Sequence, residues 1–276
     1  MQMNRIGPRA AMVGGYALVM DVISSRHNPL IQRLRRLRER PSERREQGLA
    51  VLDGEHLVSD WLAAGQPLQQ VLLGAKRAAE APAWQARGVP VVLIAEHCLS
   101  AVSAVDTPAG VMALVEVPAP RPVARGSVLA LDAVQDPGNV GALLRTAAAF
   151  GVDQVWLGGG CADAWAPKVL RAAQGAHARL APCERVDLAA ALGDYRGRVV
   201  ALDPDGGAPP HQLDLQGDIA LLLGAEGHGL HAGLRALAQA RVSICMPGAT
   251  ESLNVAMAAG IVLYERWRQG AAATPL

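Results

Sequence analysis

The chain has 276 residues, 51% of them hydrophobic, which is enough for two domains that each bury an apolar core. Its formal net charge of +1 excludes a strong attraction of the whole molecule to nucleic acid, so binding of phosphates must come from local groups of basic residues. The four cysteines form no CxxC pair, and no apolar run approaches the roughly 18 residues of a membrane span. We therefore expect a cytoplasmic protein with reduced cysteines, no metal and no membrane segment.

Residues 1–20 contain a short apolar run that only faintly resembles a signal peptide, because it holds two glycines and a basic stretch follows it. Two interpretations remain open: a disordered extension, or an upstream start with the functional chain beginning near Met20. We assign residues 1–20 to a disordered N-terminal extension.

A basic amphipathic helix is predicted over residues 30–40. Eight arginines and two acids lie between Arg26 and Arg45. The apolar residues of the helix fall on one face and arginines fill the other, until Pro41 ends it. The arginine face is either a solvated surface without a partner or a site for RNA phosphates. In the second case the RNA-binding residues are Arg26, Arg33, Arg35, Arg36 and Arg38.

Short apolar runs alternate with helical patterns through residues 21–116, which predicts a small α/β domain. Helices are expected at residues 55–64 and 77–86, and strands at residues 48–52, 69–73, 91–94 and 111–115. Residues 117–126 contain three prolines and no periodicity, so they are predicted to be a linker.

Residues 127–270 repeat the strand–helix alternation and form the second predicted domain. Strands are expected at residues 127–134, 154–157, 199–202, 219–223 and 242–245, and helices at residues 140–150 and 253–268. Regular alternation of this length predicts a parallel sheet covered by helices.

Three polar blocks that contain glycine follow apolar strands of this second domain. They begin at Asp136, Gly224 and Met246. In an open α/β sheet, the loops that leave the carboxyl ends of strands meet at one crevice, and ligands bind there. The blocks therefore predict one composite site that binds a small ligand through backbone contacts.

Each polar residue of the blocks also has a plainer interpretation. Asn139 and Ser252 can be no more than N-caps of the helices that follow them, and Glu226 can be a solvated acid. Arg145 lies among apolar and alanine residues, where an arginine is usually paired or functional, and its guanidinium could grip a phosphate. Asn254, expected one turn inside the last helix, is a poor helix former, which indicates another role.

Together the three blocks resemble the motifs of the SpoU (TrmH-like) family of RNA ribose 2′-O-methyltransferases, in the SPOUT superfamily. The first motif is matched within residues 136–151, the second within 223–230 and the third within 244–255, in the family's order and separation. Residues 23–30 and 53–55 resemble the family's substrate-binding domain, so the resemblance covers about residues 21–268. The chain departs from the pattern at Cys245, where the family usually has proline, and at Ala173, where serine is common.

The resemblance implies an α/β fold in which a Rossmann-like catalytic domain has a parallel sheet and a C-terminal deep trefoil knot. A small α/β substrate-binding domain of the L30e type precedes it. The resemblance also implies S-adenosyl-L-methionine as cofactor, S-adenosyl-L-homocysteine as product, no metal, and a homodimer through the methyltransferase domain. The cofactor-binding residues that it implies are Leu223, Gly224, Ile244, Met246 and Leu253.

The implied reaction is direct displacement of the methyl group from the sulfonium onto a ribose 2′-oxygen, which must lose its proton while it is held in line. The family role proposed for the residue at Arg145 is general base. Because the pKa of arginine is above about 12, a phosphate clamp that orients the ribose is an equally open interpretation. The implied catalytic residues are Asn139, Arg145, Glu226, Ser252 and Asn254.

The implied substrate is RNA, and ribosomal RNA more than transfer RNA, because a separate N-terminal domain is commoner among the family's ribosomal-RNA enzymes. The alternatives are a transfer-RNA 2′-O-methyltransferase of the same family and a catalytically silent RNA-binding protein with the same fold. A nucleotide-dependent oxidoreductase is disfavoured by the missing dinucleotide fingerprint. With only 5 Trp, 3 Tyr and 1 Phe for base stacking, RNA binding is expected to rely on phosphates and RNA shape.

Overall fold

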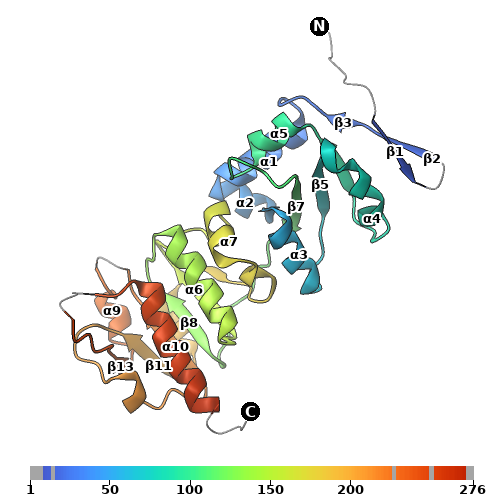
Figure 1. Ribbon diagram of the computed structural model, residues 1–276. Coiled ribbons are helices and arrows are strands. Elements are labelled where there is room, and N and C mark those ends of the chain that lie inside the picture. Colours follow the sequence, from blue (N-terminus) through green and yellow to red (C-terminus); the bar gives the residue numbers. More distant parts are fainter. Residues whose placement is uncertain (1–8, 14–15, 226–227, 249–251, 272–276) are drawn as a thin grey trace. The chain divides into compact units, whose positions relative to one another are not determined.

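The computed structural model describes residues 9–13, 16–225, 228–248 and 252–271 of the chain (Figure 1). The chain forms two compact units. Unit 1 comprises the residues up to Pro118 together with Trp165–Leu170, and unit 2 comprises Ala119–Ala164 and the residues from Arg171 onward. The division after Pro118 falls within residues 117–126, the segment predicted to be a linker; the domain boundaries themselves stay a prediction.

Unit 1 is built on a five-stranded mixed sheet of order β3-β6-β5-β7-β4. In it β3, β6 and β5 are parallel, and β7 pairs antiparallel with both β5 and β4. The four strands predicted for this domain are confirmed to within one residue at each end. The strands are β3 (Val22–Ile23), β4 (Leu49–Asp53), β5 (Gln70–Gly74), β6 (Val91–Ile94) and β7 (Val111–Glu116).

The helices of unit 1 cover this sheet and close an apolar core. The predicted amphipathic helix is confirmed, since Ile31, Leu34 and Leu37 are each 1% exposed and pack in one cluster with residues of the sheet and of α5. The helix predicted at residues 77–86 is instead two shorter ones, the second beginning beside Pro82. The helices are α1 (Pro29–Glu39), α2 (Pro41–Gln47), α3 (Glu55–Ala63), η1 (Ala75–Glu80), α4 (Ala81–Gln85) and α5 (Glu96–Val102).

The end of α1 is a corner between two helices. Pro41 does follow the end of α1 as predicted, but it also occupies the first position of α2, where proline needs no amide hydrogen. Arg44 of α2 is buried, and its guanidinium donates to the carbonyls of Leu37 (2.5 Å) and Arg38 (3.1 Å) at the end of α1. This arginine of the basic segment therefore stabilises the fold and does not face solvent.

Part of the predicted N-terminal extension is a hairpin. The strands β1 (Arg9–Val13) and β2 (Tyr16–Met20) pair antiparallel. The rest of the predicted disordered segment, residues 1–8 and 14–15, lies outside the described residues.

Unit 2 has a six-stranded sheet of order β10-β9-β8-β12-β11-β13 in which every pair is parallel, as predicted. The last strand ends three residues earlier than residues 242–245 predicted, because Ser243 donates its N–H to the carbonyl of Ala208 outside the sheet. Residues 243–248 are therefore a loop. The strands are β8 (Val128–Leu131), β9 (Gln154–Gly158), β10 (Cys183–Val186), β11 (Arg198–Leu202), β12 (Ile219–Leu223) and β13 (Ala240–Val242).

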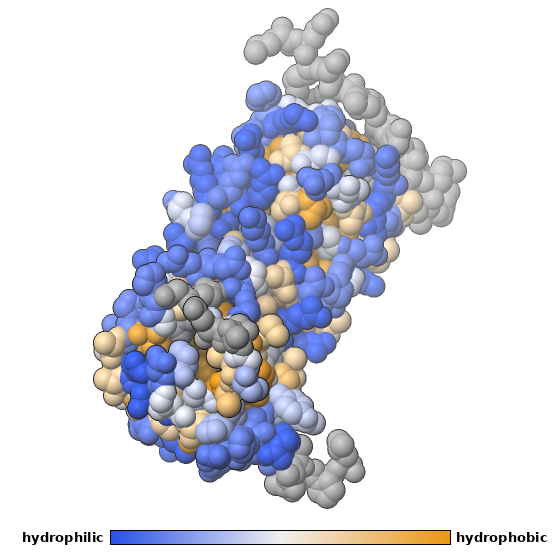
Figure 2. All heavy atoms as spheres, turned by 60° about the vertical axis from the view of Figure 1, so that its left-hand side comes forward, coloured by the Kyte–Doolittle hydropathy of each residue, from blue (hydrophilic) through white to orange (hydrophobic). Residues whose placement is uncertain are grey.

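Helices α6 and α10 pack against each other within unit 2, and Figure 1 shows them side by side. The α/β class with a parallel sheet is thus confirmed, while the trefoil knot stays a prediction. No helix within the described ranges is both long and apolar enough to cross a membrane. On the face drawn in Figure 2, hydrophilic side chains predominate, and apolar residues show in smaller patches between them. The remaining helices are α6 (Pro137–Ala149), α7 (Pro167–Ala173), η2 (Ala176–Ala178), α8 (Leu188–Asp194), η3 (Pro210–Gln212), α9 (Ala232–Arg235) and α10 (Val255–Ala271).

Candidate functional site

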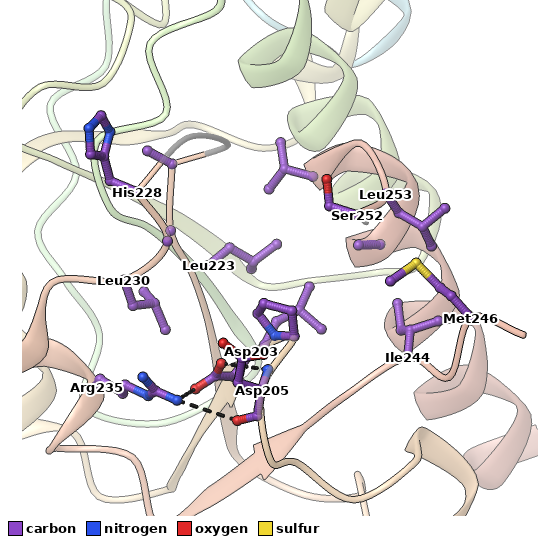
Figure 3. Close-up of a pocket in the computed structure, with 17 residues that line it drawn as sticks. Asp203, Asp205, Leu223, His228, Leu230, Arg235, Ile244, Met246, Ser252 and Leu253 are labelled. Carbon is purple, nitrogen blue, oxygen red and sulfur yellow. Dashed lines mark hydrogen bonds and ion pairs between the residues drawn. The ribbon is translucent and has the colours of Figure 1, made fainter. Parts of the chain in front are cut away.

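A cavity of about 370 Å³ lies in unit 2 where the neighbouring strands β12, β11 and β13 end (Figure 3). Loops that leave the carboxyl ends of these strands line it, together with the start of α10. All five residues predicted to bind the cofactor, and Ser252, are in its lining. The full lining is Leu202, Asp203, Pro204, Asp205, Leu223, Gly224, Ala225, His228, Gly229, Leu230, Arg235, Ile244, Met246, Ser252, Leu253, Val255 and Ala258.

The two sides of this cavity differ in chemistry. In Figure 3, Ile244, Met246 and Leu253 lie on one side, and Arg235 lies on the other with Asp203 between them. An apolar side of this kind accepts a flat ring, while the charged side offers hydrogen-bond donors and acceptors. The cavity is therefore suited to a ligand with one apolar and one polar part.

Gly224 lies where two stretches of backbone cross. A Cβ atom on Gly224 would lie 2.2 Å from the carbonyl carbon of Gly229 and 2.4 Å from the amide nitrogen of Leu230, distances that no side chain allows. The amide of Gly229 also donates to the carbonyl of Ala225 at 2.9 Å, so the second block folds back on itself. Glycine at position 224 is required for this close approach.

The first block enters α6 through a cap at Asp136, whose Oδ1 accepts from the amide of Asn139 at 2.8 Å. The prediction that the helix starts with Asn139 is therefore wrong by about one turn, because Pro137 and Gly138 are already helical. The side chain of Asn139 has a different contact: its Oδ1 accepts a hydrogen bond from Nδ2 of Asn254 at 2.8 Å. This bond joins the first block to the third.

Asn254, and not Ser252, occupies the N-cap position of the last helix. Oδ1 of Asn254 accepts from the amides of Ala256 (2.9 Å) and Met257 (3.3 Å), and α10 begins at Val255. The expectations that Ser252 caps this helix and that Asn254 lies one turn inside it are both wrong, because the chain enters the helix two residues later. The amide of Asn254 thus serves two purposes, capping with its oxygen and positioning Asn139 with its nitrogen.

Arg145 is exposed on α6, and its guanidinium has no hydrogen bond or ion pair among the described residues. It does not line the cavity. Within the described residues, the structure therefore brings Asn139 and Asn254 together and places Ser252 in the cavity wall, while Arg145 makes no hydrogen bond or ion pair with any of them. The prediction for Glu226 lies outside the described residues.

Sequence reasoning missed the wall formed after β11. Leu202, Asp203 and Asp205 line the cavity, and Arg235 of α9 makes an ion pair with Asp203. Residues 203–207 of this loop are a polar segment with two glycines directly after an apolar strand, but they match none of the three family motifs. The sequence did predict a parallel strand at residues 199–202. The carboxyl end of that strand had to lie beside the carboxyl ends of its neighbours, so the loop after it could have been assigned to the site.

A second carboxylate stands at the end of β8. Asp132 is buried, and it accepts from the amide of His231 at 2.9 Å and contacts the Nδ1 of the same residue at 2.8 Å. The contact fixes the start of α9 against β8. It is one of the links that hold the loop of the second block in place.

Two groups in unit 2 are unsuited to proton transfer or nucleophilic attack at neutral pH. Burial raises the pKa of Cys161 to about 11, so its thiol stays protonated. Burial lowers the pKa of His177 to about 4, so its ring stays neutral, and its Nε2 contacts the carbonyl of Ala164 at 2.7 Å. Within the described part of the chain, no three His, Cys, Asp or Glu side chains gather as a metal site.

The predicted RNA-binding arginines in unit 1 are not all directed to solvent. Arg38 donates to the carbonyls of Ala101 (3.1 Å) and Ser103 (2.9 Å), at the end of α5. Arg33 donates to Gln47. Arg35 and Arg36 make ion pairs with Glu39 and Glu43, and Arg26 is exposed. Neither interpretation of the arginine face, a solvated surface or a site for RNA phosphates, describes Arg38, whose guanidinium stabilises the fold at the end of α5.

Substitution of Asn254 separates its two contacts. Asn254→Ala removes the cap and is expected to lower the free energy of unfolding by about 1 kcal/mol. Asn254→Ser keeps a capping oxygen but has no amide to donate to Asn139, so stability is expected to change by only a few tenths of a kcal/mol while activity still falls at least tenfold. Thermal unfolding and the rate of methyl transfer measure the two effects. Wild-type activity in the serine variant would show that the link to Asn139 is not needed.

In the comparison with known proteins, two family models match the chain, one in each unit. Residues 126–264 match the model of the SpoU rRNA Methylase family, and residues 28–113 match the MRM3-like substrate binding domain. The chain is 33% identical to the 23S rRNA (guanosine(2553)-2′-O)-methyltransferase RlmP of Bacillus subtilis, over 89% of this chain and 98% of that protein.

Solved structures agree with this assignment. An RNA 2′-O ribose methyltransferase superposes with a TM-score of 0.74 and 31% identity, covering 90% of this chain and 98% of that one. The AdoMet-bound rRNA methyltransferase from Sinorhizobium meliloti superposes with a TM-score of 0.79 and 28% identity, covering 91% and 98%. The family model matches half of this chain, and the relative from Bacillus subtilis aligns with it almost end to end. This chain therefore belongs to the SpoU rRNA methylase family of RNA methyltransferases.

Proposed function

We propose that this protein transfers the methyl group of S-adenosylmethionine to a ribose 2′-hydroxyl of ribosomal RNA. The observation that carries the proposal is the hydrogen bond between Asn139 and Asn254. It joins the first and third family motifs in unit 2, whose cavity is lined by all five residues expected to contact the cofactor. Transfer of tritium from labelled cofactor to RNA tests it, and RNA that stays unlabelled would favour the alternative of a silent RNA-binding protein.

The residues of the cavity fit an adenosyl cofactor. A volume of about 370 Å³ is within the range of small-ligand pockets, and the lack of a side chain at Gly224 lets the backbone on both sides of it approach closely. Ile244, Met246 and Leu253 supply apolar surface for the base, with backbone groups of the same loops to bind its edge. When bound, S-adenosylmethionine supplies an electrophilic methyl group on its sulfonium.

The remaining catalytic roles are proposed for side chains of the first and third motifs. Asn254, fixed as a helix cap, holds Asn139 through its amide, so both groups are preorganised to position a ribose. Arg145 has no partner among the described residues, so its guanidinium is available to grip an RNA phosphate with two parallel hydrogen bonds and favour ionisation of the neighbouring hydroxyl. Ser252, of the third motif, contributes its side chain to the cavity wall.

Ribosomal RNA is the proposed substrate because the substrate-binding match and the catalytic match occur together. RlmP of Bacillus subtilis, a 23S rRNA enzyme by name, aligns over 98% of its own length, so both parts of the chain have a counterpart in it. Comparing 2′-O-methyl positions in total RNA from cells with and without the gene identifies the nucleotide. Loss of a methyl group from transfer RNA alone would overturn the choice of ribosomal RNA; the cytoplasmic location stays a prediction.

The basic segment of unit 1 is proposed to bind phosphates of the RNA through its accessible arginines. The triple variant Arg26→Gln, Arg35→Gln, Arg36→Gln is expected to weaken RNA binding at low salt. It is also expected to flatten the slope of log affinity against log salt by up to about one unit for each lost phosphate contact. Arg38 is left intact because it stabilises α5. Fluorescence titration over a range of salt concentrations measures the slope.

A control with the same change of charge distinguishes local contacts from the overall field of the protein. Arg87, Arg179 and Arg196 are exposed and lie outside the basic segment. If their replacement by Gln flattens the salt slope as much as the first triple does, the segment has no special part in RNA binding. Cofactor affinity is expected to be the same in both triples.

The homodimer is proposed to form on the exposed face of α10. Met257, Ile261, Tyr264 and Trp267 are 62%, 41%, 52% and 46% exposed and lie along one face of the helix. Phe150 extends this surface, since its ring lies 6.4 Å from that of Tyr264. A contiguous apolar patch on a protein surface usually marks an interface with another protein.

A charge on this face tests the proposal. Ile261→Glu is expected to give a monomer by light scattering on a sizing column, because an unpaired carboxylate would be buried in the interface. Leu237→Glu is the control, since Leu237 is 36% exposed but lies outside α10. A dimer that survives the Ile261 substitution would exclude this face.

A further inference from the structure

Asp203 is a buried carboxylate in the wall of the cavity. It follows β11 directly, and only 5% of its surface is exposed. Its amide donates to the carbonyl of Val242 at 3.0 Å, so its backbone is fixed to the end of the neighbouring strand β13. Burial of a carboxylate costs free energy unless it is paired, so its place in the wall calls for partners.

Both carboxylate oxygens of Asp203 have partners. Oδ1 of Asp203 accepts from the amide of Asp205 at 3.0 Å, and Oδ2 lies 2.5 Å from a guanidinium nitrogen of Arg235. The same guanidinium donates to the carbonyl of Asp205 at 3.3 Å, as the dashed lines of Figure 3 show. The ion pair thus ties the loop after β11 to α9 and fixes the orientation of the carboxylate.

The carboxylate can still accept further hydrogen bonds. Oδ2 is fully buried and faces the guanidinium groups of Arg235 and, at 3.9 Å, Arg241. Oδ1 accepts from the amide of Asp205, which leaves one of its lone pairs for a further donor. The opposite side of the cavity, with Ile244, Met246 and Leu253, has apolar side chains. Asp203 is therefore the buried acceptor that a ligand with hydroxyl donors would meet inside the cavity.

We propose that Oδ1 of Asp203, whose carboxylate is oriented by Arg235, accepts a hydrogen bond from a hydroxyl of the cofactor's ribose and so determines the specificity of the cavity for a ribonucleoside. The inference rests on the proposed seating of the cofactor here. When the base lies against the apolar side of the cavity, the sugar lies next to the wall that contains Asp203. The ribose presents O–H donors on two adjacent carbons, and a hydrogen bond from one of them to the charged Oδ1 is stronger than one to a neutral acceptor.

The first test needs no substitution. Calorimetry of the wild-type protein compares S-adenosylhomocysteine with its 2′-deoxy and 3′-deoxy analogues and with the analogue that carries hypoxanthine in place of adenine. Loss of a hydroxyl that binds a charged acceptor is expected to weaken affinity by roughly tenfold to hundredfold. Deoxy analogues that bind as tightly as S-adenosylhomocysteine overturn the proposal.

The second test couples residue and ligand. Asp203→Asn keeps the size of the side chain and removes its charge, so S-adenosylhomocysteine is expected to bind roughly tenfold or more weakly. For the deoxy analogues, which already lack the hydroxyl donor, the same substitution is expected to lower affinity much less. A side chain that only held the loop in shape would weaken all ligands equally, and that result overturns the proposal. Asp194→Asn, an exposed residue of α8, is the charge-matched control.

The hypoxanthine analogue distinguishes a contact of Asp203 with the sugar from a contact with the base. If Asp203→Asn changes the affinity difference between adenine and hypoxanthine and not the difference between ribose and deoxyribose, the carboxylate contacts the base and the proposal is overturned. A wild-type protein that binds none of these ligands contradicts the proposed cofactor site itself. Binding of S-adenosylhomocysteine without any coupling to Asp203 contradicts only the inference about the sugar.

Discussion

Replacing Arg145 with alanine is expected to abolish methyl transfer while the affinity for S-adenosylmethionine stays within about tenfold, or 1.4 kcal/mol. The physical reason is that Arg145 lies outside the cavity lining, so the cofactor does not depend on it. Its guanidinium is expected to act on the RNA phosphate in the transition state. Single-turnover transfer of tritium and calorimetry of the cofactor measure the two quantities separately.

Folding does not complicate this experiment. Arg145 is exposed on α6 without a partner among the described residues, and alanine is the better helix former, so the thermal midpoint is expected to stay close to that of the wild type. Arg145→Lys is expected to remain inactive, because an ammonium cannot form the two parallel bonds of a guanidinium. Arg179→Ala, another exposed arginine of unit 2, is the control that keeps activity. Near-normal turnover in Arg145→Ala would remove this residue from the mechanism.

The strands could be predicted because their signal is local. Residues 219–223 and 91–94 are apolar throughout, and the structure has strands with the same bounds. Both lie within their sheets with partners on either side. All of β12 and the last two residues of β6 are buried, which excludes polar side chains there. At the sheet edge the predicted strand 242–245 was wrong: β13 ends at Val242, because the amide of Ser243 bonds to a loop carbonyl instead.

The ends of helices were harder to predict, because several residues can satisfy the same free amides. Ser252 and Asn254 are both good caps by type, and only the geometry of α10 selects Asn254. The same selection gives Asn254 the position from which it reaches Asn139. A contact between residues 115 positions apart in the chain has no local signature.

The charged side of the cavity could not be predicted for a similar reason. Asp203 follows β11 and Arg235 lies in α9, and neither belongs to one of the three family motifs, so no motif indicated that they form an ion pair. The run of arginines predicts a basic surface, but two of its members have a structural role instead. Arg38 and Arg44 donate hydrogen bonds to carbonyls at the ends of helices. Sequence pattern predicts which loops meet, and the fold determines which side chains face one another.

The backbone crossing at Gly224 leads to the second large expected effect. Gly224→Ala is expected to lower the affinity for S-adenosylhomocysteine at least hundredfold and to lower the thermal midpoint of unfolding. The added Cβ would lie 2.2 to 2.4 Å from backbone atoms of Gly229 and Leu230, so these loops must move apart. Both belong to the cavity wall, and any shift that relieves the clash changes the surface against which the cofactor binds.

Gly233→Ala is the matched control, because Gly233 lies in α9 of the same unit and a Cβ there meets nothing within 4 Å. This substitution is expected to leave cofactor affinity unchanged and to stabilise the fold by up to about 1 kcal/mol, since alanine restricts the unfolded chain and favours the helix. Calorimetry and thermal unfolding of the two variants give the comparison. If Gly224→Ala binds S-adenosylhomocysteine as tightly as Gly233→Ala does, the crossing has room for a side chain, and the glycine of the second motif is not required by close packing of the backbone.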